Sequence, residues 1–150
     1  MAQPNPIPQQ QFAPYAGLPL PQPSWDNYKF WEYCRQHELR LQKCSDCGSY
    51  RYYPRPACPD CHSMQFEWTK VSGKGSVYSY TIAYNPVLPY FADKVPLPVG
   101  VIKLDEGNVF MVGRILETAP EDVKIGMAVE VLFEDAAEDI SLPQWRPAGG

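Results

Sequence analysis

The second half of the chain holds five segments with the apolar alternation, or the β-branched and aromatic content, that is typical of β-strands. They are EWTKVSGKGSVYSYTIAY (67–84), PVGVIKL (98–104), VFMVGRIL (109–116), AVEVLFE (128–134) and ISLPQW (140–145). Gly73 and Gly75 indicate a bend or bulge in the first strand, residues 105–108 a hairpin turn, and residues 117–126 a helical turn. Five short antiparallel strands with a longer connection before the fourth predict a closed barrel of the OB type, with an SH3-like barrel as the alternative.

The first half has a different pattern. Residues 1–24 contain seven Pro and five Gln and no charged side chain, which predicts an extended leader. This leader is either a disordered tail or a polyproline-like strap on a partner surface. Ser24 is a candidate N-cap for a helix that begins at Trp25 and carries Phe30 and Cys34 on an apolar side. We interpret Cys34 as a buried small apolar residue, and His37, near the helix end, as a surface residue.

Four of the five cysteines form two close pairs between the helix and the barrel. Each pair has two residues between its cysteines, and ten residues separate the pairs, whose members are Cys44, Cys47, Cys58 and Cys61. Two such knuckles complete the four-thiolate shell that zinc accepts, and a filled shell leaves no position for water or substrate. The spacing therefore predicts a structural zinc ribbon. Iron bound by the same four thiolates, and His62 as a substitute ligand, are the alternatives.

The loop between the cysteine pairs combines guanidinium groups with aromatic rings. Arg51, Tyr53 and Arg55 are candidate contacts for a nucleotide-like group such as coenzyme A. The alternative is that the rings cover the small ribbon core and the arginines are solvated.

Charge and hydropathy exclude several classes of function. The net charge is -4. Residues 26–75 carry eight Lys and Arg against six Asp and Glu, whereas residues 76–150 carry five against eleven. An acidic barrel argues against nucleic acid or an anionic membrane as the main partner. The absence of a long apolar stretch and of a signal-peptide pattern, together with unpaired cysteines, predicts a cytoplasmic protein.

The sequence contains no recognisable catalytic set. Neither of the two histidines, His37 and His62, has an obvious Ser or Cys partner, and no glycine-rich phosphate loop is present. We therefore assign no catalytic residue. The connection YNPVLPYFADKVPLP (84–98) is long and apolar, and it is expected either to bury itself against another protein or to fold as a lid on its own barrel.

Residues 25–147 resemble a known family. The segments LRLQKCSDCG, YYPRPACPDC, EWTKVSGKGSVYSYT, IGMAVEVLFE and LPQWRP resemble the zinc-ribbon plus OB-fold proteins that accompany thiolase-like enzymes. Two features depart from that pattern: His62 stands where many members have Gly, and the leader has no counterpart. The resemblance implies a mainly β protein with an N-terminal helix, a rubredoxin-like ribbon and an OB-fold.

The domain organisation that follows is a leader (1–24), a helix and lead-in strand (25–42), a zinc ribbon (43–67) and an OB-fold (68–147). The resemblance implies a non-catalytic accessory subunit of a thiolase-fold enzyme, assembled as a heterotetramer or larger. The complex would act on a coenzyme A thioester by β-ketoacyl-CoA thiolysis or retro-aldol cleavage during breakdown of an aromatic or steroid compound. The alternatives are a single-strand nucleic-acid-binding module and a free acyl-CoA carrier.

Overall fold

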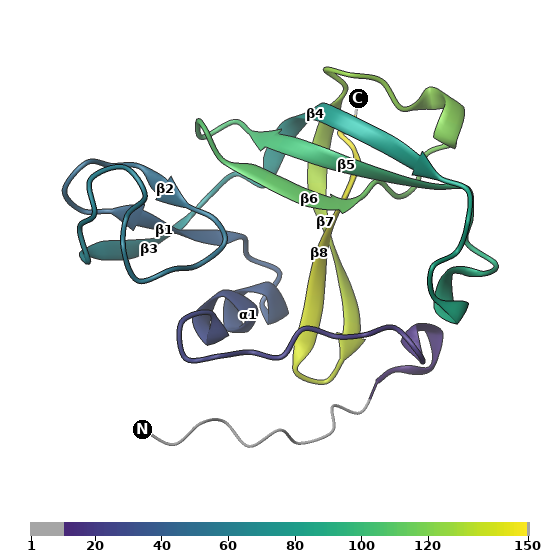
Figure 1. The fold of residues 1–150 in the computed structure, drawn as a ribbon, viewed down its shortest axis with the longest axis horizontal. Coiled ribbons are helices and arrows are strands. Elements are labelled where there is room, and N and C mark those ends of the chain that lie inside the picture. Colours follow the sequence, from purple (N-terminus) through teal and green to yellow (C-terminus); the bar gives the residue numbers. More distant parts are fainter. Residues whose placement is uncertain (1–10, 150) are drawn as a thin grey trace.

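The strands of this chain form two antiparallel sheets, which lie side by side in Figure 1. The computed structural model describes residues 11–149. The smaller sheet has the order β2-β1-β3, and the larger one has the order β6-β5-β4-β7-β8. The predicted leader lies partly outside the described residues, since residues 1–10 are not among them.

The smaller sheet carries the cysteine knuckles. It consists of β1 (Arg40–Cys44), β2 (Tyr50–Arg51) and β3 (Phe66–Lys70), and β1 pairs with both of the others. Each short strand leads into or out of a knuckle, so the sheet sets the distance between the two cysteine pairs.

The larger sheet is the predicted five-stranded OB barrel. Its strands are β4 (Lys74–Ala83), β5 (Leu97–Leu104), β6 (Phe110–Arg114), β7 (Ala128–Ala137) and β8 (Ile140–Pro147). An isolated parallel bridge between Ile115 and Trp145 closes the barrel between its two outer strands. The predicted helical turn is the 3-10 helix η3 (Pro120–Asp122).

The first predicted strand is divided between the two sheets. Residues 66–70 pair with β1, whereas residues 74–83 pair with β5 and β7. Gly73, with φ of +72°, forms the joint, which is the bend that the glycines indicate. Of the two alternatives predicted for the glycines, a bend or a bulge, the structure has the bend, and the irregularity in the β4–β5 ladder lies between Val77 and Ser79.

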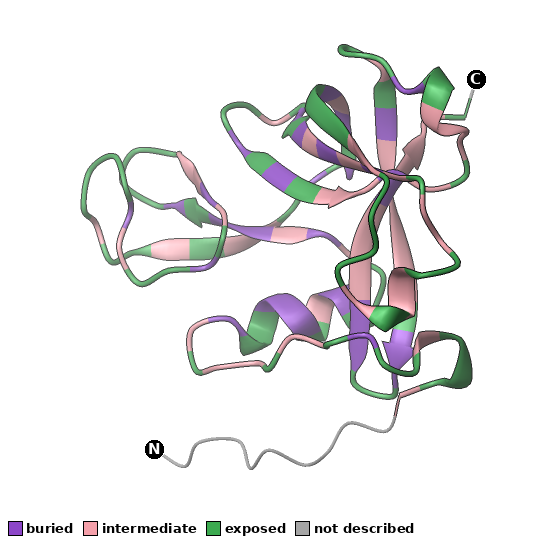
Figure 2. Ribbon diagram, turned by 45° about the vertical axis from the view of Figure 1, so that its right-hand side comes forward, coloured by how far each residue is buried: buried purple, intermediate pink, exposed green. Residues whose placement is uncertain are grey.

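Helix α1 (Tyr28–Arg35) joins the ribbon to the barrel. It begins later than predicted, because residues 24–27 form a turn in which the carbonyl of Ser24 accepts the N–H groups of Asn27 and Tyr28. Its buried side chains Phe30, Trp31 and Cys34 belong to one core cluster with the barrel interior. Figure 2 shows this buried face turned toward the β7–β8 hairpin. Cys34 is fully buried, as predicted, and burial raises the pKa of its thiol to about 12.

The described part of the leader packs on its own chain. Gln11 bridges to Ala137, the N–H of Phe12 donates to the carbonyl of Ala136, and Leu18 is buried. The leader contains the 3-10 helix η1 (Ala13–Tyr15) and runs beside the β7–β8 hairpin and below α1 in Figure 1. Residues 11–24 are thus a strap, lying here on the chain's own surface. None of the helices among residues 11–149 is long and apolar enough to cross a bilayer.

Replacing Gly113 with Ala is expected to destabilise the barrel by about 1–3 kcal/mol, because a Cβ there overpacks the core. The added atom would lie 2.7 Å from Cδ1 and 2.9 Å from Nε1 of Trp145, which is fully buried. Urea unfolding measures the change. Gly149→Ala is the matched control, since its Cβ meets no atom within 4 Å. Equal unfolding free energies for the two variants would contradict this close packing.

Asp135 is expected to contribute stability that disappears in acid. It accepts hydrogen bonds from the Ser141 hydroxyl (2.5 Å) and pairs with His37 Nε2 (2.7 Å), and these contacts lower the pKa of its carboxyl. A lowered pKa means that the stabilisation is complete above the unfolded-state pKa of about 3.9 and is lost as pH falls through the folded-state pKa. The free energy of unfolding of the natural chain should therefore exceed that of Asp135→Asn at pH 7, and the difference should shrink below about pH 4. A difference that does not change with pH would contradict this assignment.

Candidate metal centre and an apolar pocket

The two cysteine knuckles have the same backbone geometry. In the first, the N–H of Gly48 donates to the carbonyl of Cys44 (3.0 Å) and the N–H of Cys44 to Ser49 (2.8 Å). In the second, the N–H of His62 donates to the carbonyl of Cys58 (3.0 Å) and the N–H of Cys58 to Ser63 (2.8 Å). The two turns therefore present their cysteines as a matched pair.

The four sulfurs lie where one ion would hold them. Their Sγ atoms are all within 4.8 Å of one another. The Cys44 and Cys61 sulfurs are 3.6 Å apart, and the Cys47 and Cys58 sulfurs are 3.5 Å apart. A tetrahedral zinc shell with bonds of about 2.3 Å sets its sulfurs about 3.8 Å apart, so the arrangement fits. The cluster is positioned to bind a metal ion.

Hydrogen bonds from backbone N–H groups stabilise the thiolate form of two of these cysteines. The N–H groups of Cys47 and Asp46 lower the pKa of Cys44 to about 6. The N–H groups of Cys61 and Asp60 lower the pKa of Cys58 in the same way. Because a metal binds the thiolate, the lowered pKa values favour metal binding by Cys44 and Cys58, whereas desolvation and the neighbouring sulfurs raise the pKa of Cys61.

His62 occupies the position of Gly48 in the second knuckle. Its φ of +63° matches the left-handed turn at Gly48, with φ of +76°, so the second knuckle closes without a glycine. Among residues 11–149, the metal-ligating cluster contains the four cysteines and not His62.

Arg51 is buried inside the ribbon. Its side chain is 1% exposed, and its guanidinium lies over the ring of Phe66, 5.0 Å from the centroid. The guanidinium donates to four carbonyls, those of Arg55, Pro56, Ser63 and Gln65. These carbonyls lie on either side of Cys58 and Cys61 in the sequence. We therefore assign Arg51 a structural role in holding the second knuckle, in place of the coenzyme A contact predicted for it.

Tyr53 and Arg55 lie nearer the surface. The Tyr53 hydroxyl accepts hydrogen bonds from Asn27 Nδ2 (2.9 Å) and Trp31 Nε1 (3.0 Å), which ties the ribbon to α1. Arg55 lines a hollow of about 200 Å³ whose other walls include Trp25, Tyr28 and Trp68. The coenzyme A contact of Tyr53 and Arg55 stays a prediction.

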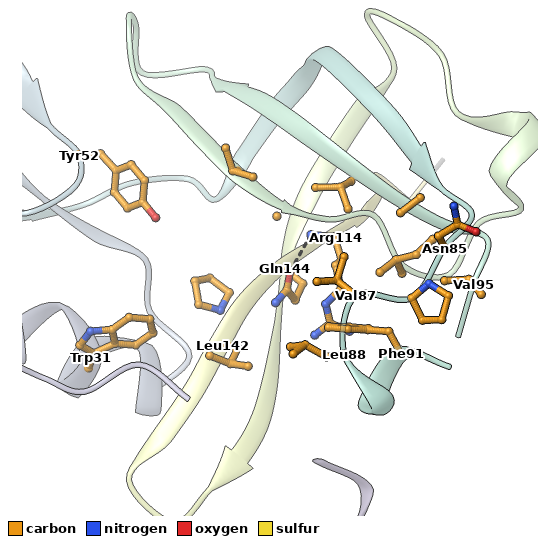
Figure 3. Close-up of a pocket in the computed structure, with 17 residues that line it drawn as sticks. Trp31, Tyr52, Asn85, Val87, Leu88, Phe91, Val95, Arg114, Leu142 and Gln144 are labelled. Atoms are coloured by element: carbon orange, nitrogen blue, oxygen red, sulfur yellow. Dashed lines mark hydrogen bonds between the residues drawn. The ribbon is translucent and has the colours of Figure 1, made fainter. Parts of the chain in front are cut away.

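An apolar pocket of about 480 Å³ lies between the barrel and the loop at 84–97. Trp31 and Tyr52 approach it from the ribbon side, and the other walls come from the loop, the outer face of β5 and β6, and β8 (Figure 3). The loop contributes Asn85, Pro86, Val87, Leu88, Phe91 and Val95. Of the two expectations for this loop, the lid on its own barrel agrees with its placement here.

Sequence reasoning did not identify the pocket. One signal was present: Val99 and Val112 are outward positions of the barrel, where a solvated sheet face would carry polar residues. The segment VFMVGRIL is therefore apolar on both faces, a pattern that indicates a covered or ligand-binding surface.

Comparisons with known proteins match both parts of the chain. The family model described as the rubredoxin-like zinc ribbon domain of ChsH2 matches residues 31–67, and that of the C-terminal OB-fold domain of ChsH2 matches residues 68–134. A solved chain titled "Ltp2-ChsH2(DUF35) aldolase" aligns with a TM-score of 0.77 and 33% identity, over 87% of this chain and 100% of its own length.

Curated relatives include proteins of two kinds. A "DUF35 domain-containing scaffold protein" of Methanocaldococcus jannaschii is 39% identical over 65% of this chain and 68% of its own length. A "probable enoyl-CoA hydratase alpha subunit" of Thermomonospora curvata is 34% identical over 93% of this chain. This chain spans only 43% of the length of that hydratase subunit.

Proposed function

This chain belongs to the ChsH2 (DUF35) family of zinc-ribbon and OB-fold proteins, and from that premise we propose that it is a non-catalytic accessory subunit of a thiolase-fold enzyme. The complex would act on acyl-CoA thioesters in the breakdown of an aromatic or steroid compound, in the cytoplasm. The observation that carries the proposal is the alignment with the whole DUF35 chain of a structure titled as an aldolase.

The metal would serve the fold rather than the reaction. Cys44, Cys47, Cys58 and Cys61 would hold a zinc ion, and four protein ligands leave no coordination position for a substrate. When bound, the ion supplies a rigid link between the two knuckles. A rigid ribbon beside α1 gives the subunit a fixed surface for its catalytic partner.

The chemistry of individual side chains supports a catalytic centre on the partner. Burial raises the pKa of the Cys34 thiol to about 12, so it is not a nucleophile at neutral pH. His37 and the Ser141 hydroxyl both bond the same oxygen of Asp135, so the serine faces a carboxylate and not the imidazole that would activate it.

Reconstitution tests the proposal. The purified chain is expected to show no turnover of a β-ketoacyl-CoA with free coenzyme A, or of a β-hydroxyacyl-CoA alone. Co-expression with a thiolase-fold subunit is expected to yield a co-purifying complex with one of the two activities. Cleavage that requires free coenzyme A identifies thiolysis, and release of a carbonyl product without it identifies retro-aldol cleavage. Turnover by the isolated chain would overturn the proposal.

The alternative of single-strand binding has weaker support. OB-folds that bind single strands combine a basic groove with exposed aromatic platforms. Here Tyr78 on β4 and Phe110 on β6 are exposed rings in contact with each other, but the barrel half is acidic, since residues 76–150 carry eleven acidic against five basic side chains. An oligonucleotide titration should give weak binding at every salt concentration, whereas tight binding that falls steeply with salt would favour the alternative.

A further inference from the structure

The pocket under the loop at 84–97 has the properties of a small-molecule site. We propose that it binds a small apolar compound, aryl or alkyl in its body, that ends in an acceptor oxygen, either a carboxylate or a carbonyl. This site lies on the accessory chain itself and does not depend on the proposed partner.

The size and walls of the pocket suit such a body. Its volume of about 480 Å³ falls within the range of about 300–1,000 Å³ that is usual for ligand pockets. Aromatic and aliphatic side chains form most of its lining, including Trp31 and Phe91 on opposite sides in Figure 3. An aryl or alkyl group there would be removed from water on several sides, which favours binding.

The polar end of the pocket is formed by Arg114. Its side chain is 11% exposed, and it is paired with Glu134 on one side and lies 5.8 Å from the ring centroid of Phe91. Among residues 11–149, Glu134 is the only side chain or carbonyl that accepts a hydrogen bond from the guanidinium. The other guanidinium nitrogens of Arg114 are not fully buried, and Arg114 lines the pocket, so their N–H groups are available to a bound acceptor.

A second donor lies beside Arg114. The Oε1 atom of Gln144 accepts the backbone N–H of Arg114 at 2.7 Å, so its amide nitrogen points away from that bond. Figure 3 shows the Gln144 side chain among the pocket residues next to Arg114. An amide nitrogen and a guanidinium are both donors only, so the complementary ligand group is an acceptor. A carboxylate and a carbonyl share that property, and a planar carboxylate can also bind a guanidinium through two oxygens.

Calorimetric titration of the full zinc-loaded chain tests the proposal with three probes that share one phenyl body. We expect saturable binding of 4-phenylbutyrate or 4-phenylbutan-2-one, and binding of 4-phenylbutylamine at least about tenfold weaker, because its ammonium group meets Arg114 with like charge. Tighter binding of the acid than of the ketone means that the acceptor group of the ligand is a carboxylate, and tighter binding of the ketone means that it is a carbonyl. Failure of both oxygen-bearing probes to saturate, or equal affinity of the amine, overturns the proposal.

Two matched variants test whether the probes bind in this pocket. Val112 and Ile125 are both 65% exposed, but only Val112 lines the pocket. Val112→Glu puts a carboxylate beside Arg114 that competes for its free donors, and it should weaken the tighter-binding of the two oxygen-bearing probes at least about tenfold. Ile125→Glu adds the same charge outside the pocket and should leave the affinity unchanged. Equal effects of the two substitutions would overturn the proposal, and because no partner is present, the outcome is separate from that of the reconstitution.

Discussion

Converting Cys58 to Ser is expected to release the metal and unfold the ribbon. Structural zinc contributes about 10–16 kcal/mol in isolated zinc-finger peptides, which is more than the hydrogen bonds of Arg51 to the second knuckle can replace. Cys58 is buried, and its sulfur is 3.5 Å from that of Cys47, so a hydroxyl there breaks the shell. Metal analysis should find one zinc per natural chain and a large loss in the variant, with loss of ordered ribbon signals by NMR.

Cys34→Ser is the control for this experiment. Cys34 is the cysteine outside the metal cluster, and it is fully buried on α1. Its replacement should lower the free energy of unfolding by burying a hydroxyl, yet it should leave the zinc content unchanged. Retention of zinc by Cys58→Ser, or absence of zinc from the natural chain, would contradict the structural metal site. Because the ribbon carries the proposed docking surface, Cys58→Ser should also fail to assemble with a thiolase-fold partner.

The barrel and the knuckles could be predicted because their signals are local. Alternation in residues 98–104 and 128–134 marks strands that face one core, and the cysteine spacing alone encodes a knuckle. The five-stranded sheet of the barrel and the four-cysteine cluster are present in the structure as predicted.

The features that were missed depend on contacts between distant residues. The first strand divides at Gly73 because residues 66–70 pair with β1 in the ribbon, and such pairing is not encoded in the alternation itself. The donors of Arg114 and Gln144 meet only when β6 approaches β8 at the barrel closure. The burial of Arg51 could not be predicted for a similar reason. An arginine among tyrosines is typical of an exposed binding surface, and nothing in the sequence shows that four carbonyls enclose its guanidinium.

Arg51→Met is expected to weaken zinc retention and to destabilise the ribbon. The substitution keeps an apolar side chain of similar length over Phe66 but removes the N–H groups that donate hydrogen bonds to four carbonyls. Hydrogen bonds to a charged group contribute about 1.5–3 kcal/mol each and do not simply add, so we expect a loss of at least about 3 kcal/mol. A zinc ion with four thiolates also carries net negative charge, which the buried guanidinium partly offsets. Zinc transfer to a chromogenic chelator should be at least about tenfold faster in the variant, since about 1.4 kcal/mol corresponds to a factor of ten.

Two further substitutions separate this role from general effects of removing an arginine. Arg55→Met removes the same charge from an exposed position of the same loop, and it should change zinc release little. Arg51→Lys keeps the charge but not the planar fork that reaches several carbonyls at once, so it should restore zinc retention only in part. If Arg51→Met and Arg55→Met release zinc at the same rate, the guanidinium does not hold the second knuckle. Since the carbonyls of Pro56 and Ser63 lie on either side of Cys58 and Cys61, full retention in Arg51→Met would mean that the zinc alone sets the position of these two cysteines.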